Sequence, residues 1–199
     1  MNQFEDSPQP SMDNSSSLRS WLFQDWSSNS KRRDCQILLL WFRLAQWAHT
    51  RWGFPGRIAV TTYWWFTSLV LGIELPPTTT VGPRLHLYHP HTIVIHPNSR
   101  LGSDCHLRQG VTIGNRVDRF GIVLGVATLG NHVDLGAGCV VIGDLHVGDH
   151  ARIGALSVVT KSVPAWAVVA GNPSRVIRID SPESPESEYD DPEESRSPS

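Results

Sequence analysis

Residues 129–163 read LGNHVDLGAGCVVIGDLHVGDHARIGALSVVTKSV, and this stretch repeats every six residues. Its aliphatic side chains stand six positions apart without exception, at Leu129, Leu135, Val141, Val147, Ile153 and Val159. The residue four places after each of them is small or apolar. Neither a helix nor a single strand has a strict period of six. The repeat therefore predicts one short strand and corner, stacked on copies of itself around a narrow apolar core.

The repeat extends towards the N-terminus and changes phase on the way. One phase is held by Val81, Leu87 and Ile93, and a second phase, shifted by two, by Ile95, Leu101, Leu107 and Ile113. Leu129 follows Ile113 by sixteen positions, which is not a multiple of six, so we expect a loop to leave the stack within residues 115–126. Loops on a rigid scaffold often carry function.

Two apolar segments with helical spacing precede the repeat. Residues 31–52 and residues 58–71 are predicted helices, separated by a break at residues 53–56 (GFPG). Neither segment has eighteen uninterrupted apolar residues, so a membrane-spanning helix is not expected. A peripheral membrane contact and a cap or oligomer contact at the end of the repeat are both open for this segment, which contains Trp64 and Trp65.

Composition divides the chain into a disordered N-terminal tail (1–20), a helical cap or oligomer segment (21–73), the repeat (74–179) and an acidic, disordered tail (180–199). The acidic tail leaves the remaining chain mildly basic, although the net charge is −2. That balance suits a small anionic ligand better than a nucleic acid. Three cysteines make no disulfide framework, and residues 1–20 lack the apolar core of a signal peptide, so we expect a cytoplasmic location.

Three motifs accompany the repeat: IELPPTTTVG with LYHPHTIVI (73–82 and 87–95), RQGVTIGN (108–115) and VAGNPSRV (169–176). With them, about residues 25–177 resemble the hexapeptide-repeat acyltransferases, in particular the serine O-acetyltransferases and the exopolysaccharide acetyltransferases of colanic-acid type. The resemblance implies an all-β fold, a left-handed parallel β-helix with a short N-terminal helical segment. It also implies a homotrimer that binds acetyl-CoA between neighbouring subunits and needs no metal.

The same resemblance implies that His89 is the general base and that Glu74, fifteen residues earlier, orients it. Imidazole suits this task because it titrates near neutral pH. His86, His91 and His96 crowd the same stretch, so a plain surface role is the alternative for any one of these histidines.

The residues that match positions near the cofactor in the family are Gly136, Ala137, Gly154, Ala155, Thr160, Lys161 and Arg175. Small residues let the pantetheine arm run close to the backbone, and the two cations can meet the phosphates. Corner geometry alone is the alternative explanation for the glycines and alanines.

Departures from the serine acetyltransferase pattern favour another acceptor. That family places an acidic residue before the base and an Arg-His pair in the excursion loop, whereas this chain has Tyr88 before His89 and Gly125-Val126 at the positions of the pair. A sugar hydroxyl needs no such charged partners. We therefore expect an acetyl-CoA-dependent O-acetyltransferase acting on a sugar in exopolysaccharide biosynthesis, with serine O-acetyltransferase as the first alternative.

Two further alternatives come from other classes of protein. The spacing of His91 and His96 matches two zinc ligands of γ-class carbonic anhydrases, but no suitable upstream histidine is present and Pro97 follows. The second alternative is a non-catalytic trimeric scaffold. The presence of Glu74 and His89 argues against it, because a scaffold does not need this pair.

Overall fold

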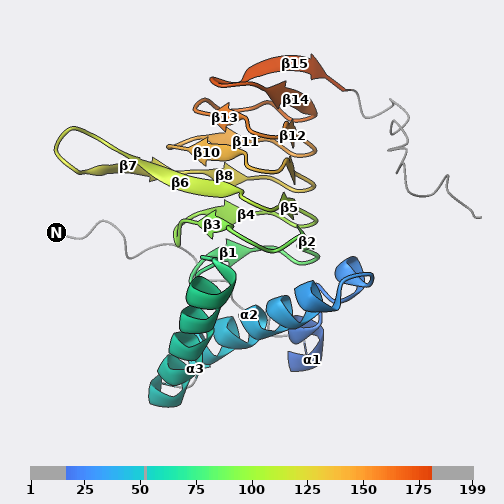
Figure 1. The fold of residues 1–199 in the computed structure, drawn as a ribbon, viewed down its shortest axis with the longest axis vertical. Helices are drawn as coiled ribbons and strands as arrows, with labels where there is room; N and C mark the ends of the chain where they lie inside the picture. The colour runs from blue at the N-terminus through green and yellow to red at the C-terminus, as the bar shows by residue number, and fades with distance from the viewer. Residues whose placement is uncertain (1–16, 52, 181–199) are drawn as a thin grey trace, which may run out of the picture.

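The chain forms a column of stacked coils that stands on a group of helices (Figure 1). The computed structural model describes residues 17–51 and 53–180. Three sheets form the faces of the column, and within them all neighbours except β14 and β15 run parallel. The first face holds β1 (Thr80–Val81), β4 (Arg100–Leu101), β8 (Thr128–Leu129) and β11 (His146–Val147). The second holds β2 (His86–Tyr88), β5 (His106–Arg108), β9 (Asp134–Leu135), β12 (Arg152–Ile153), β14 (Ala167–Ala170) and β15 (Arg175–Ile179). The third holds β3 (Val94–Ile95), β6 (Thr112–Val117), β10 (Val140–Ile142) and β13 (Val158–Val159).

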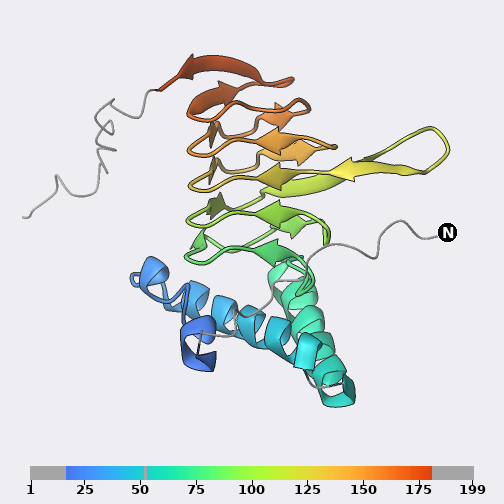
Figure 2. The ribbon, with the colours of Figure 1, turned by 180° about the vertical axis from the view of Figure 1, so that it is seen from behind.

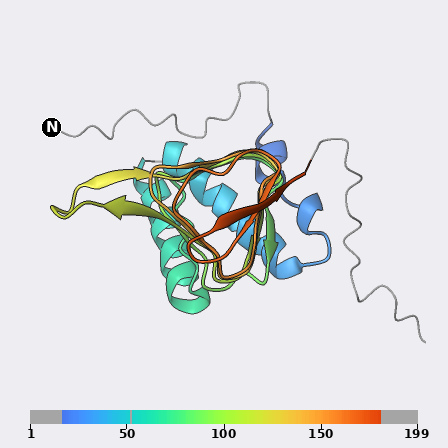
Figure 3. The same ribbon diagram turned by 90° about the horizontal axis from the view of Figure 1, so that it is seen from above.

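This arrangement is a parallel β-helix, and the strand register stacks the repeat positions on one another. Leu101 pairs with Leu129, and Leu129 pairs with Val147. Every aliphatic position predicted from the six-residue period is buried. Seen from above, the coils superimpose as one outline (Figure 3). The predicted core is confirmed, because each coil adds one layer of aliphatic side chains to it.

The expected excursion is a β-hairpin. Strand β6 continues beyond the third face and pairs in antiparallel fashion with β7 (Val123–Val126). The hairpin projects sideways from the column (Figures 1 and 3). Its tip is closed by Asp118, whose Oδ1 accepts hydrogen bonds from the backbone N–H groups of Phe120 and Ile122. The large apolar side chains of its tip and its returning strand are exposed, at Phe120, Ile122 and Leu124.

The helical segment consists of α1 (Leu18–Leu22), a short 3-10 turn η1 (Ser27–Asn29), α2 (Arg33–Arg51), α3 (Gly53–Phe66) and a π-helical turn η2 (Thr67–Leu71). The first helix ends at Arg51, as the break predicts, but residues 53–56 form the first turn of α3, so the second helix begins at Gly53 and not at Ile58. Pro55 is tolerated there, since the first backbone N–H groups of a helix have no partner within the helix. The expected tails lie largely outside the described residues.

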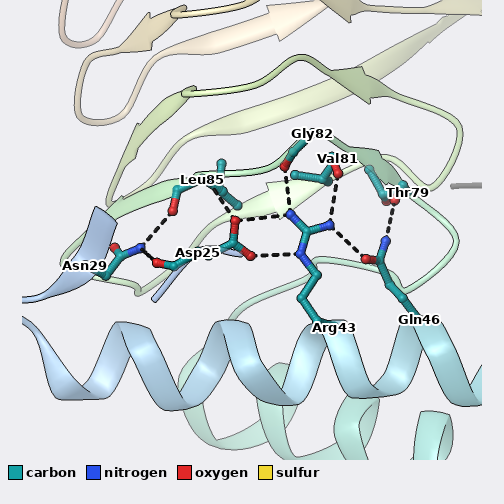
Figure 4. A network of polar contacts seen from close by, with 8 residues as sticks. All are labelled: Asp25, Asn29, Arg43, Gln46, Thr79, Val81, Gly82 and Leu85. Carbon is teal, nitrogen blue, oxygen red and sulfur yellow. Dashed lines mark hydrogen bonds and ion pairs between the residues drawn. The ribbon is translucent and has the colours of Figure 1, made fainter. Parts of the chain in front are cut away.

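A buried polar network joins this helical segment to the first coil (Figure 4). Arg43 on α2 is 0 % exposed and donates through all its guanidinium nitrogens. Its acceptors are the Asp25 carboxylate at 2.8 and 3.2 Å, Gln46 Oε1 at 2.9 Å, and the carbonyl oxygens of Val81 at 2.9 Å and Gly82 at 2.7 Å. Asp25 Oδ1 also accepts from Leu85 N at 2.9 Å, so both buried charges are fully paired.

Candidate active site

The first phase change of the repeat is a longer corner in the first coil. Leu87 pairs with Leu107, and Ile95 pairs with Ile113. Along the chain, Ile95 follows Leu87 by eight positions, whereas Ile113 follows Leu107 by only six. The corner between β2 and β3 therefore contains two more residues than the corner above it. His89 lies in this corner in a left-handed conformation, with φ of 53°. The side chain of His89 is exposed in this longer corner.

The His89 ring contacts the start of α2. Nη1 of Arg32 lies 3.2 Å from Nδ1 of His89. The same guanidinium is held by Asp34, through Nε to Oδ1 at 3.1 Å and Nη2 to Oδ2 at 2.7 Å. The hydrogen bond from Arg32 lowers the pKa of Asp34 to about 2. Arg32 is therefore a fixed donor at one nitrogen of the candidate base.

This contact determines which ring nitrogen carries the proton. An arginine has donors only, so Nδ1 of His89 accepts and is unprotonated. A neutral ring in this arrangement carries its proton on Nε2. The free electron pair that could accept a proton is consequently on Nδ1, at the nitrogen that Arg32 covers.

Glu74, the predicted orienting acid, belongs to the same coil but is held through its backbone. Its N–H donates to Ile93 O, and its carbonyl oxygen accepts from Ile95 N, each at 2.7 Å. The side chain is exposed. Among the residues that the structure describes, no hydrogen bond or ion pair joins the Glu74 carboxylate to His89. Glu74 thus belongs to the same coil as His89, but the direct contact with the ring comes from Arg32. Arg32 directly precedes α2, and nothing in the sequence indicated this contact.

Beside the corner lies a group of aromatic and charged side chains that sequence reasoning missed. The imidazoles of His86 and His106 stack with their centroids 4.1 Å apart, and the hydroxyl of Tyr88 lies 3.3 Å from Nδ1 of His106. Arg108 covers the Tyr88 ring and pairs with Asp134 of the next coil. Burial, assisted by the neighbouring His86, lowers the pKa of His106 to about 4. The parallel register brings these side chains together from positions that are 18 to 26 residues apart.

Four of the predicted cofactor residues follow strands on the same corner as His89, in coils further along the column. Gly136-Ala137 and Gly154-Ala155 are stacked, with Gly136 N donating to Ile153 O at 2.8 Å and Leu156 N to Ala137 O at 2.9 Å. Arg175 on β15 pairs with Ala170, which lies against Gly154. The structure therefore brings His89, these four residues and Arg175 onto one edge of the column.

Thr160 and Lys161 lie on the next edge instead. They follow β13, whose register with β10 places them beside Ile142 and Gly143, in the corner from which the hairpin departs in an earlier coil. Both side chains are exposed. Within one chain, they are separated from the other predicted cofactor residues by the width of the third face.

Packing alone explains the two glycines of the cofactor set. A Cβ on Gly136 would lie 2.5 Å from Ala155 N, and one on Gly154 would lie 2.9 Å from the Cβ of Ala170. No side chain fits between these stacked backbones. The small exposed side chain of Ala155, and the half-exposed one of Ala137, carry more information, because a larger residue would be accommodated at the surface.

His91 and His96, the candidate ligands of a zinc site of carbonic anhydrase type, have different surroundings. His91 is exposed, and His96 Nδ1 accepts from Asn98 N at 3.2 Å within a turn. In the described part of the chain, no three His, Cys, Asp or Glu side chains converge as a metal site would require. Burial raises the pKa of Cys105 to about 11 and of Cys139 to about 12, so neither thiol is an activated nucleophile.

Comparison with known proteins gives relatives in one functional class. A serine acetyltransferase of Mycobacterium tuberculosis is 36 % identical over 137 residues, which are 68 % of this chain and 57 % of that protein. An Escherichia coli protein named as a colanic acid biosynthesis acetyltransferase, WcaB, is 38 % identical over 111 residues, which are 55 % of this chain and 66 % of that protein. No family model matches the chain.

A solved structure described as a serine acetyltransferase in complex with CoA has the same fold, with a TM-score of 0.66 and 22 % identity over 79 % of this chain and 68 % of that one. The chain spans between about half and two thirds of the length of these two curated relatives. In sequence and in fold, the chain is thus a relative of the acetyltransferases named for serine and for colanic acid biosynthesis.

Proposed function

We propose that this chain is an acetyl-CoA-dependent O-acetyltransferase in which His89 is the general base. The observation that carries the proposal is the longer corner, which holds an exposed imidazole against Arg32 on the same edge as the small residues Ala137 and Ala155. A scaffold protein has no use for an imidazole fixed by a guanidinium in this position.

The reaction is a direct transfer in a ternary complex. His89 takes the proton from the acceptor hydroxyl as that oxygen attacks the thioester carbonyl of acetyl-CoA. The tetrahedral intermediate collapses with cleavage of the carbon–sulfur bond, and the imidazolium returns the proton to the leaving CoA thiolate. No acyl-enzyme is required, since the thiols of Cys105 and Cys139 are buried and protonated at neutral pH.

The acceptor hydroxyl must reach Nδ1 if the ring keeps the tautomer that Arg32 imposes. We propose that the hydroxyl takes the place of Nη1 of Arg32 on Nδ1, while Asp34 keeps the guanidinium beside the acceptor oxygen. Arg32 thus orients the ring before the acceptor binds, and orients the acceptor afterwards. Glu74 remains a proposed partner for the imidazolium that forms, reached by a change of its exposed side chain.

Acetyl-CoA would lie along the edge that carries Ala137, Ala155 and Arg175. Thr160 and Lys161 occupy the next edge, so they complete this site only from a neighbouring subunit. A homotrimer of left-handed β-helices, with the edges of neighbouring chains side by side, supplies that arrangement. Lys161 and Arg175 would then meet the CoA phosphates from two subunits.

We propose a saccharide acceptor of exopolysaccharide biosynthesis, handled in the cytoplasm. Gly125 and Val126, at the end of β7, provide no charged group for an amino acid at the positions where the serine enzymes have one. Serine O-acetyltransferase is the second candidate, favoured by the name of the M. tuberculosis relative and by the cation Arg32 beside the base.

An acceptor screen tests the proposal. Purified protein is incubated with acetyl-CoA and either L-serine, sugar nucleotides or oligosaccharides, and the released thiol is followed. We expect thiol release with a saccharide acceptor and its loss in His89→Ala. Turnover on L-serine alone would replace the saccharide by the second candidate, and no binding of acetyl-CoA or CoA in calorimetry would contradict the enzyme itself.

A further inference from the structure

Helix α3 and the turn η2 are apolar on both sides. The inner side packs against α2, with Tyr63 fully buried and its ring 5.8 Å from that of Trp41. The outer side carries five large apolar side chains that are between 36 % and 70 % exposed, namely Ile58, Trp64, Trp65, Leu69 and Val70. Phe66, also partly exposed, lies at the border and packs against Trp41 with the ring centroids 5.2 Å apart. A helix with apolar residues all round is normally covered on both sides. An exposed face of this size therefore indicates an interaction surface.

The hydroxyl groups on this face are already satisfied within the helix. Thr61 Oγ1 donates to Arg57 O at 2.8 Å, and Thr62 Oγ1 donates to Ala59 O at 3.0 Å. These two polar groups therefore enter an apolar environment without losing a hydrogen bond, because their donors are paired with the backbone.

The stretch of chain that forms this face is positively charged, and the exposed Glu74 follows directly after it. From Cys35 to Ile73 the sequence contains no acidic residue. Arg51 and Arg57 are exposed where α2 ends and α3 begins, whereas Arg43 is buried in the network with Asp25. Strand β15 lies at the end of the column opposite α3 (Figures 1 and 2). An anionic surface is the partner that this distribution of charge favours.

Helices that lie in the headgroup region of a bilayer are typically rich in tryptophan, phenylalanine and arginine. Within residues 17–51 and 53–180, no helix is long and apolar enough to cross a bilayer, so the contact is with the surface. We propose that the outer face of α3 and η2 binds the headgroup region of a membrane rich in anionic lipids. The first coil with His89 then faces the bilayer end of the molecule, within reach of an acceptor held there.

The test is co-sedimentation of the full chain with vesicles of phosphatidylcholine alone, or of phosphatidylcholine and phosphatidylglycerol in equal parts. It needs neither acetyl donor nor acceptor, so it is independent of the proposed function. We expect at least ~10-fold stronger binding to the anionic vesicles, weakened by added salt. The double variant Trp65→Ser/Leu69→Ser should lose ~10-fold or more of this binding.

The matched control is Val176→Ser/Ile177→Ser on β15, where two exposed apolar side chains lie at the other end of the column. This variant should bind vesicles as the natural chain does. Arg51→Gln and Arg57→Gln should each lower binding by ~5-fold and reduce its dependence on salt, without touching the helix packing.

Three outcomes would overturn the proposal. They are absence of vesicle binding by the natural chain, equal loss in the β15 control, and unchanged binding in the Trp65/Leu69 variant. If vesicle binding is absent and the mass in analytical ultracentrifugation falls on Trp65→Ser/Leu69→Ser, the face is covered by a second copy of the chain instead. Unfolding curves of each variant separate these outcomes from loss of the fold.

Discussion

Two arginines of the helical segment reach the same first coil, and they differ in what surrounds them. Arg43 is fully buried, and its guanidinium is enclosed by acceptors from Asp25, Gln46 and the coil backbone. Arg32 lies at the surface, with its side chain 36 % exposed, paired with Asp34 and in contact with His89. Burial makes the first arginine a part of the fold, since its charge has no alternative partner. Exposure leaves the second one free to exchange partners, which a reacting site requires.

Removal of Arg43 should give the largest effect on stability. Arg43→Leu leaves the Asp25 carboxylate buried without its cation, so we expect a loss of ~3–5 kcal/mol in the free energy of unfolding. Urea unfolding measures it. Arg32→Leu is the matched control and should change stability by less than ~1 kcal/mol. Similar losses in both variants would contradict the distinction between the two arginines.

Among the proposed variants, removal of the His89 imidazole should lower activity most. His89→Ala is expected to lower turnover by ~10²-fold, because the acceptor hydroxyl is no longer deprotonated during attack. Steady-state kinetics with the acceptor found in the screen measure the change, and the unfolding curve should stay as in the natural chain. His91→Ala, two residues away and also exposed, is the control with near-normal turnover. A near-normal rate in His89→Ala would remove His89 from the mechanism.

Arg32 should affect activity and leave stability unchanged. Arg32→Gln loses the fixed donor at Nδ1 of His89, so we expect kcat/KM to fall by ~10-fold. Asp34→Asn weakens the hold on the guanidinium and should cause a smaller loss in the same direction. NMR of the ring nitrogens reports whether the proton moves from Nε2 when Arg32 is absent. A faster enzyme in Arg32→Gln would show that the arginine blocks the base nitrogen.

The smallest expected effect is a pH dependence of stability that comes from the half-buried His106. His106 has a pKa of about 4 in the folded chain, below the ordinary value of 6.5, because burial disfavours its charged form. The unfolded chain therefore binds more protons, and stability falls as the pH drops from about 6.5 towards 4. His106→Gln should flatten this part of the curve of unfolding free energy against pH. A slope identical to that of the natural chain would assign the acid sensitivity to other groups.

The core of the column follows from the sequence because a period of six has one structural explanation. Leu129 and its equivalents are buried as predicted, and the break after Ile113 is the hairpin. The first turn of α3 was missed, because glycine and proline usually indicate the end of a helix. Both residues are tolerated in the first turn of a helix, and there they do not interrupt it. The contact between Arg32 and His89 was missed as well, because 57 positions separate the two residues and nothing periodic connects them.

The candidate site is predictable only in part, because its contacts join residues that are far apart in the sequence. The sequence points to the corner at His89 through a shift of phase, but not to the ring stack of His86 and His106, which depends on register between coils. Whether Glu74 orients His89 stays a prediction. The backbone of Glu74 lies in the first coil, but the side chain that contacts the His89 ring is that of Arg32.

The network around Arg43 also sets a direction for the loss of structure. In a column where each coil contacts only its neighbours, unravelling starts at an end. The helical end is fastened through Asp25, Arg43 and the backbone of Val81 and Gly82, whereas every residue of β15 at the other end is exposed. Hydrogen exchange should therefore advance from β15 towards the first coil, so that the corner with His89 belongs to the last part of the molecule to open.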